Sequence, residues 1–189
     1  MKKVLFSLAS ALVYASASAQ QFDNSIQRLA DQRAAMQRLS ALDGVWRGPA
    51  VTTLPNGEKF ELIQTERVGP LLEGTVKVIE GRGYDAAGKT VFNAFGTVAF
   101  DPSSKEYKFH SHAQSYYGSH PMKVTDDGFV WEIPAGPTTM RFTTSIKNGT
   151  WIETGDRVMA NGQTVRFFEM KLKRVGDTSW PAGGTVSPR

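Results

Sequence analysis

Residues 92–104, with the sequence FNAFGTVAFDPSS, join a strand pattern to a turn. Successive side chains of a β-strand point to opposite faces, so alternate positions share one face. That face carries only small and apolar residues here: Phe92, Ala94, Gly96, Val98 and Phe100. The Asp-Pro-Ser-Ser that follows is typical of a chain reversal. The segment predicts a strand with a well-defined inward face, small residues at its centre and a turn at its end.

Similar turn sequences recur at short intervals from Val45 to Arg174. They are Pro55–Gly57, Gly69-Pro70, Asp85–Gly88, Asp101–Ser104, Tyr117–Ser119, Asp126–Gly128, Ala135–Pro137, Lys147–Gly149 and Ala160–Gly162. The Asn-Gly and Asp-Gly pairs among them favour tight hairpins, because both central residues of a type I′ turn need a positive φ. Turns at this spacing separate about ten short strands in an up-and-down meander. Since closing the sheet removes its two exposed edges, we predict an all-β fold, an antiparallel β-barrel of about ten strands.

The N-terminus has the three parts of a secretory signal peptide. Lys2 and Lys3 precede an apolar run over residues 4–15, and small residues follow at Ala17-Ser18-Ala19. We therefore predict cleavage after Ala19 and a periplasmic or secreted location. The apolar run is too short for a comfortable membrane span and no later segment is apolar enough, so an integral membrane protein is not expected.

The predicted signal peptide (residues 1–19) is followed by a lead-in (residues 20–41), the barrel domain (residues 42–175) and a flexible tail (residues 176–189). The lead-in contains one short helix, expected over about residues 24–40. Its apolar stripe consists of Phe22, Ile26, Leu29 and Met36. This helix either caps a mouth of the barrel or merely leads into the domain, and the stripe slightly favours capping.

The charge balance gives no basis for nucleic-acid binding. The chain has 22 basic and 18 acidic residues. The signal peptide takes two lysines, which leaves 20 against 18, a net charge of +2, with no Lys/Arg cluster. The sequence contains no cysteine, so the fold holds without disulfides, as a core drawn from 4 Trp, 11 Phe and 5 Tyr can support. A monomer or a homodimer is expected.

The apolar parity of each strand predicts which side chains line the barrel. The ligand-lining residues predicted in this way are Phe60, Leu62, Gln64, Glu66, Glu80, Arg82, Phe92, Trp131, Met140, Phe142 and Glu153. Several are charged, and buried charge is costly unless it is paired and hydrogen-bonded. These groups either pair with one another near a barrel end, or line a cavity for a ligand with a polar head and an apolar body.

Gly44-Val45-Trp46 opens the first strand just after the helix, and this element resembles the calycin superfamily of lipocalins and fatty-acid-binding proteins. The resemblance implies that a basic residue of the last strand packs over the Trp and closes the barrel. The candidates for that role are Lys171, Lys173 and Arg174. Residues 64–68 (QTERV), 79–81 (IEG) and 167–174 (FFEMKLKR) resemble an uncharacterised bacterial family of lipocalin-like domains, over about residues 42–175.

Two ligands of the superfamily do not carry over to this sequence. The ten-stranded relative nitrobindin binds haem through a histidine near its C-terminal strands, whereas no histidine follows His120 here. Fatty-acid-binding proteins use an Arg-x-Tyr on the final strand, whereas Arg166 is followed by Phe167-Phe168. No cofactor is predicted.

The three histidines are the only candidates for a metal site. His110 and His112 share one face of a strand, a spacing that many metal sites use, and His120 could join them across a hairpin. Lys108 lies on the same polar face and no carboxylate stands at a nearby ligand position. We expect His110 and His112 to face solvent and predict no metal site.

The sequence favours a binding protein that holds a small hydrophobic or amphipathic molecule inside the barrel. One alternative is an enzyme in which the interior carboxyls Glu66 and Glu80 act as general acid and base. No nucleophile motif, cysteine or phosphate-binding loop accompanies them, so an enzyme is the less favoured interpretation. The other alternative is a structural protein with a filled core and an exposed apolar patch.

Overall fold

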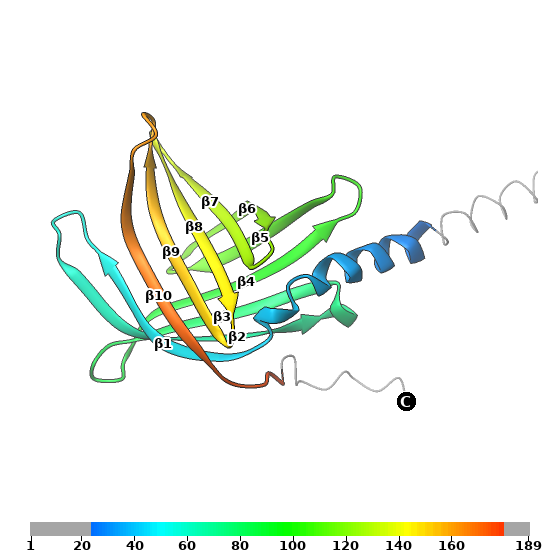
Figure 1. The fold of residues 1–189 in the computed structure, drawn as a ribbon, viewed down its shortest axis with the longest axis horizontal. Helices are drawn as coiled ribbons and strands as arrows, with labels where there is room; N and C mark the ends of the chain where they lie inside the picture. The colour runs from blue at the N-terminus through cyan, green and yellow to red at the C-terminus, as the bar shows by residue number, and fades with distance from the viewer. Residues whose placement is uncertain (1–23, 180–189) are drawn as a thin grey trace, which may run out of the picture.

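Ten antiparallel strands pair in sequence order and the last pairs with the first, so the sheet closes into a barrel (Figure 1). The computed structural model describes residues 24–179. The strands are β1 (Gly44–Thr53), β2 (Lys59–Leu71), β3 (Val76–Tyr84), β4 (Thr90–Asp101), β5 (Glu106–Ala113), β6 (Tyr116–Val124), β7 (Gly128–Ala135), β8 (Thr138–Lys147), β9 (Thr150–Met159) and β10 (Thr164–Gly176). A helix over residues 24–37 and the 3-10 turn η1 (Ser40–Leu42) precede them, and η2 (Leu72–Gly74) joins β2 to β3. The predicted ten-stranded all-β barrel with an N-terminal helix is confirmed.

The predicted signal peptide, Phe22 and most of the predicted C-terminal tail lie outside the described residues. Within residues 24–179, no helix is long and apolar enough to cross a bilayer.

The turn predicted at Gly69-Pro70 is wrong. Both residues lie inside β2, and the chain reverses after them at η2. There Leu72, Glu73 and Gly74 all have positive φ, at 48°, 55° and 86°. Leu and Glu rarely adopt this region, so two of the three residues that make the reversal, Leu72 and Glu73, carry no turn signal in the sequence.

The turn predicted at Tyr117–Ser119 is also wrong, because these residues lie inside β6. The chain reverses at Gln114-Ser115, with φ of 50° and 70°. The Gln114 side chain supports this turn by donating a hydrogen bond to the Val91 carbonyl and accepting one from the Asn93 backbone N–H.

The helix and η1 close one end of the barrel. Met36, Leu39 and Leu42 are only 1–3 % exposed and belong to the same buried cluster as the barrel core. The Tyr107 hydroxyl on β5 donates a 2.8 Å hydrogen bond to the Ala35 carbonyl. The capping role favoured by the sequence is therefore confirmed for the C-terminal part of the helix.

The rest of the helix projects past the strands, beside the β2–β3 and β4–β5 turns (Figure 1). Arg28 pairs there with Asp101, and Arg33 with Glu73 of η2. Ile26 and Leu29, which the sequence assigns to the packed stripe, are 52 % and 43 % exposed. That part of the predicted stripe is wrong, because only the last turn of the helix reaches the barrel core.

Trp46 fixes the core at this closed end. It is 1 % exposed, its indole N–H donates a 2.8 Å hydrogen bond to the Leu42 carbonyl, and its ring packs edge-on against Trp151 at 5.7 Å. Arg174 of β10 stands opposite Trp46 in register and donates to the Asp43 carbonyl. Of the three basic residues expected near this Trp, Arg174 is the one that stands opposite Trp46 in register, whereas Lys173 pairs with Arg47.

The helix over residues 24–37 and η1 together form a plug at one end of the barrel. Truncating Leu39, which is buried in this plug, should cost more stability than truncating the exposed Leu29. We expect Leu39→Ala to lower the unfolding free energy by about 2–5 kcal/mol, the usual range for a buried Leu→Ala change. Leu29→Ala, the matched control on the exposed face, should change it by less than about 0.5 kcal/mol. Urea unfolding followed by tryptophan fluorescence measures both values. Equal losses in the two variants would contradict the placement of the plug.

Candidate functional site

Directly opposed residues of antiparallel strands point to the same face of a sheet, so the strand register identifies the side chains that face into the barrel. Predicted lining residues that occupy inward positions are Phe60, Leu62, Gln64, Glu66, Phe92, Trp131, Met140, Phe142 and Glu153. Gln64 and Glu66 are buried, whereas Phe60 is 44 % exposed because it lies near the tip of the β1–β2 hairpin. The others are half-buried.

The predicted interior placement of Glu80 and Arg82 is wrong. The inward residues of β3 are the alternate set Lys77, Ile79, Gly81 and Gly83, each opposite an inward residue of β2. Gly81 leaves room there for the Glu66 carboxyl, since a Cβ at this position would lie 2.7 Å from a carboxylate oxygen and displace it. Glycine adds no apolar signal to the inward face of β3, and the apolar Val76 and Val78 give the wrong parity.

Glu80 and Arg82 belong to an ion-pair network on the outer wall. Glu80 accepts hydrogen bonds of 2.7 Å from both Arg67 and Arg82. Partial burial alone raises the pKa of Glu80, but the hydrogen bonds from Arg82 and Arg67 outweigh it and hold the pKa below its ordinary value. The proposed acid–base pair of Glu66 and Glu80 is therefore excluded, because the barrel wall separates the two side chains.

The second carboxyl inside the barrel is Glu153 of β9. The Gln64 amide donates a 2.7 Å hydrogen bond to Glu66, and the Thr144 hydroxyl donates a 2.6 Å hydrogen bond to Glu153. Burial raises the pKa of Glu66 to about 8, with smaller contributions from the charges of Glu153 and Glu80, against the opposing effect of Gln64. Burial also raises the pKa of Glu153. Glu66 is thus mostly protonated at neutral pH.

Trp151 lies beside these carboxyls with an unpaired donor. The residue is 3 % exposed, and its indole N–H makes no hydrogen bond of proper geometry within the described part of the chain. The N–H lies close enough to Glu153 to lower the pKa of that carboxyl, so it interacts weakly without forming a bond. A buried donor in this state is costly, and such groups mark places where a partner is missing.

An aromatic wall adjoins the carboxyls on the β5–β10 side of the interior. It consists of Phe109, His120, Trp131, Phe142, Phe167 and Phe168. Trp131 is at its centre, stacked on Phe142 at 4.3 Å and packed edge-on against Phe109 at 4.9 Å. Phe142 precedes Thr144, the hydroxyl partner of Glu153, by one inward position on β8. The wall and the carboxyls therefore form one continuous surface.

Four members of the wall are absent from the predicted lining set. The register of β10 shifts between Arg166 and Phe168, and this bulge lets both Phe167 and Phe168 pack against Phe142. A regular strand would place the two rings on opposite faces. Phe109 has the right parity in the sequence, on the face opposite the strand's histidines. The inward position of His120 was not predicted, because the turn was wrongly placed directly before this residue.

The histidines do not converge. His110 and His112 are exposed on the outer face, as expected, while His120 faces inward, 5.4 Å from the Trp131 ring. Burial lowers the pKa of His120, and the nearby His110 lowers it further. Among residues 24–179, no group of three or more His, Asp or Glu side chains is arranged to hold a metal ion.

The barrel interior retains accessible surface next to the carboxyls. Trp131, Met140, Phe142, Phe168 and Glu153 all point inward, yet each is only half-buried. Side chains of a filled barrel would be covered from within as well as by the wall. Part of the interior is therefore open to solvent or to a small molecule.

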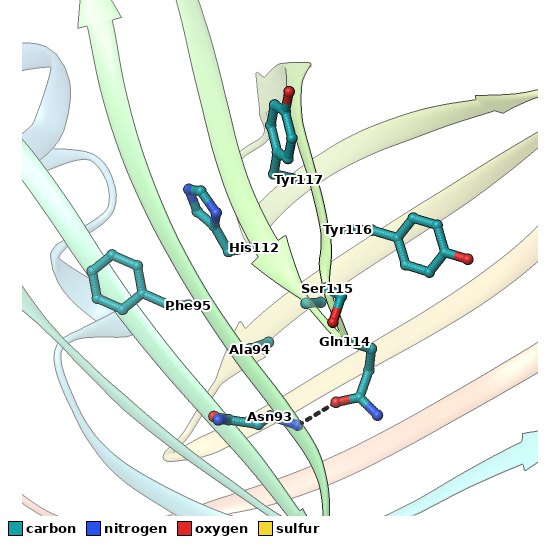
Figure 2. A pocket seen from close by; sticks show the side chains of 9 residues that line it. Asn93, Ala94, Phe95, His112, Gln114, Ser115, Tyr116 and Tyr117 are labelled. Carbon is teal, nitrogen blue, oxygen red and sulfur yellow. Dashed lines mark hydrogen bonds between the residues drawn. The ribbon is translucent and has the colours of Figure 1, made fainter.

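A separate pocket of ≈ 300 Å³ lies on the outer wall at the end of β4, β5 and β6 (Figure 2). Phe95, His112 and Tyr117 project to one side there, while Tyr116 points away from them. Tyr117 stacks on His112 at 6.1 Å and is 84 % exposed. An open surface of this kind excludes little water, so we consider the interior the stronger candidate for recognition of a small molecule.

The closed ring of ten antiparallel strands, with the helix and η1 at one end, defines an up-and-down β-barrel. Among solved structures, the fold is similar to the crystal structure of Rv2717c from M. tuberculosis, with a TM-score of 0.56. The similarity covers 74 % of this chain and 96 % of that one, at 16 % sequence identity, so it extends to the fold alone. No known sequence family and no curated protein matches the sequence.

Glu66 should make the protein less stable as the pH rises. Its pKa is about 8 in the folded protein, whereas an ordinary glutamate, as in the unfolded chain, has a pKa of 4.5. Between these two pH values the unfolded chain has lost a proton that the folded chain keeps. The unfolding free energy should therefore fall by on the order of 1.4 kcal/mol per pH unit from this group, and level off above pH 8. Urea unfolding from pH 5 to 9 should show a shallower fall in Glu66→Gln. Glu61→Gln, on the exposed face of the same strand, is the control and should retain the wild-type slope.

Proposed function

We propose that this protein is an exported binding protein that holds a small, partly hydrophobic molecule inside the barrel. The aromatic wall supplies apolar contact, and Glu66 and Glu153 orient a polar group of the ligand. The half-buried state of the inward side chains carries this proposal, because it leaves surface for a ligand between the wall and the carboxyls.

The distribution of charge supports a binding role over a structural one. The outer wall pairs its charges, as in the Arg67–Glu80–Arg82 network and the Arg166–Asp156 pair. Within the described part of the chain, the hydrogen-bond partners of the two interior carboxyls are Gln64 and Thr144, neither of which is charged. Buried acids without counter-ions destabilise a barrel whose only task is to fold. Their presence beside an unfilled space is better explained by ligand recognition.

A neutral fluorescent lipophile tests the proposal. N-phenyl-1-naphthylamine should bind with increased emission, and Trp131→Ala should weaken that binding about 5- to 30-fold, equivalent to roughly 1–2 kcal/mol of lost aromatic contact. Phe95→Ala and Tyr117→Ala change exposed rings of the outer pocket and should leave binding within about twofold of wild type. Circular dichroism confirms that each variant is folded.

Two outcomes would contradict this prediction. If the probe binds equally to wild type and Trp131→Ala but is lost in Phe95→Ala, then the outer pocket is the binding site. If no emission increase occurs with the folded wild-type protein, then the barrel does not hold lipophiles of this size.

The proposed export rests on the N-terminal sequence. The pattern of Lys2-Lys3, the apolar run and Ala17-Ser18-Ala19 should direct the chain through a bacterial inner membrane, with cleavage after Ala19. Intact-mass analysis of the periplasmic fraction should give a mature protein that begins at Gln20. Ala19→Arg should abolish cleavage and leave the precursor with the cell membranes. Recovery of the uncleaved wild-type chain from the cytosol would contradict the proposed location.

A further inference from the structure

The polar end of the barrel interior is acidic, and this restricts the chemistry of a ligand. Glu66 of β2 stands opposite Trp46 in register, Glu153 lies two residues from Trp151 on β9, and the two Trp rings pack at 5.7 Å, so the carboxyls come from the same level of the barrel. Besides burial, the groups that shift the pKa of Glu66 are Gln64, Glu153 and Glu80, and those that shift the pKa of Glu153 are Thr144 and Trp151. None of these is basic. Both carboxyls therefore face the barrel interior, and within residues 24–179 no basic side chain is among the groups that shift their pKa values.

The basic and titratable side chains at the other inward positions contact partners other than Glu66 and Glu153. Lys77 donates a 2.6 Å hydrogen bond to Asp43, and Arg174 bonds the Asp43 carbonyl and Asp177. The remaining groups are Tyr107, bonded to Ala35, His120, packed on Trp131, and Arg157, whose guanidinium lies 5.7 Å from the Phe167 ring centre. Among the described residues, the interior cations thus lie near the helix and near the aromatic wall, each with its own partner, and none of them pairs with Glu66 or Glu153.

Trp151 gives a second and independent indication of a ligand. Its buried N–H has no formed hydrogen bond and interacts with Glu153 in the sense that favours the ionised carboxylate. A carboxylate is a stronger acceptor than a carboxylic acid. A bound cation would stabilise the ionised form of Glu153, and this form is the stronger acceptor for the Trp151 N–H.

We propose that the ligand is an alkylamine with an aromatic or aliphatic body, whose ammonium group lies between Glu66 and Glu153 and whose body lies against Trp131 and Phe142. This inference rests on the proposed function and specifies its ligand class. An inorganic cation fits less well, because Mg²⁺ and Ca²⁺ require six or more oxygen ligands and the adjoining surface is aromatic. Aromatic faces attract ammonium groups as well as apolar bodies, so both parts of the amine find matching surface.

Binding of an amine must release a proton near neutral pH. Glu66 is mostly protonated in the free protein, and an ammonium ion stabilises its carboxylate form. Affinity for the amine should therefore rise between pH 6 and pH 8, by up to about 50-fold where binding ionises Glu66 fully, since less work is needed to ionise Glu66 at the higher pH. A neutral ligand of the same shape should show no such rise.

Isothermal titration calorimetry with three matched naphthalene probes tests the proposal. The probes are 2-(2-naphthyl)ethylamine, 2-(2-naphthyl)ethanol and 2-naphthylacetate, which differ chiefly in the charge of the head group. At pH 7.5 the amine should bind at least tenfold more tightly than the alcohol, and the acetate most weakly. Titrations in buffers of different ionisation enthalpy should show the release of up to about one proton per bound amine.

Substitutions identify the groups responsible. Glu66→Gln and Glu153→Gln should each reduce the preference for amine over alcohol at least fivefold while leaving alcohol binding within about twofold. Glu61→Gln, an exposed carboxyl on the outer face of β2, is the matched control and should retain the full preference. Thermal unfolding confirms that the variants remain folded.

The results separate this inference from the function on which it rests. Equal binding of amine and alcohol by the wild-type protein, or a preference that survives both interior substitutions, overturns the amine assignment and leaves a barrel for neutral ligands. Binding of N-phenyl-1-naphthylamine without binding of the naphthylethylamine also overturns the amine assignment. Failure of all four compounds to bind overturns the proposed function itself.

Discussion

The buried contacts of Trp46 hold together the parts on which the rest of the structure depends. Its strand pairs with β2 on one side and with β10 on the other, so it stands at the seam that closes the barrel. Its N–H bonds the Leu42 carbonyl and thereby ties the plug to the sheet. Its ring meets Trp151 edge-on and supports the interior at the level of the two carboxyls. Closure, plug and site thus share one anchor, and a change there affects all three.

This anchor also explains how buried acids are tolerated. The closed end excludes water from Glu66, and the resulting desolvation keeps that group neutral at the pH where an exposed glutamate is charged. Gly81 provides the space for the carboxyl, and Gln64 satisfies one of its oxygens. The surrounding barrel is closed by backbone hydrogen bonds along every strand, so it can absorb the local cost.

The sequence predicts the fold well because turn chemistry and strand parity are local properties. The face from Phe92 to Phe100 lies inward as predicted. Prediction fails where the structure uses residues that carry no local signal. The inward glycines of β3 make the outer face look more apolar, so Glu80 was assigned to the wrong side. The bulge that brings Phe167 inward depends on pairing with β9, which a single strand's sequence does not encode.

The candidate site is less predictable than the fold for a related physical reason. A carboxyl on an inward position is recognisable from parity, as Glu66 and Glu153 were, but its partners depend on register across several strands. Those partners decide its chemistry: Glu80 with two arginines outside the wall is held ionised, whereas Glu66 inside it is held neutral. The same residue type therefore forms an ion pair on the outer face and, on the inner face, is a carboxyl whose hydrogen-bond partner is an uncharged amide. Only the second can select a ligand, because an acid already paired gains little from a new cation.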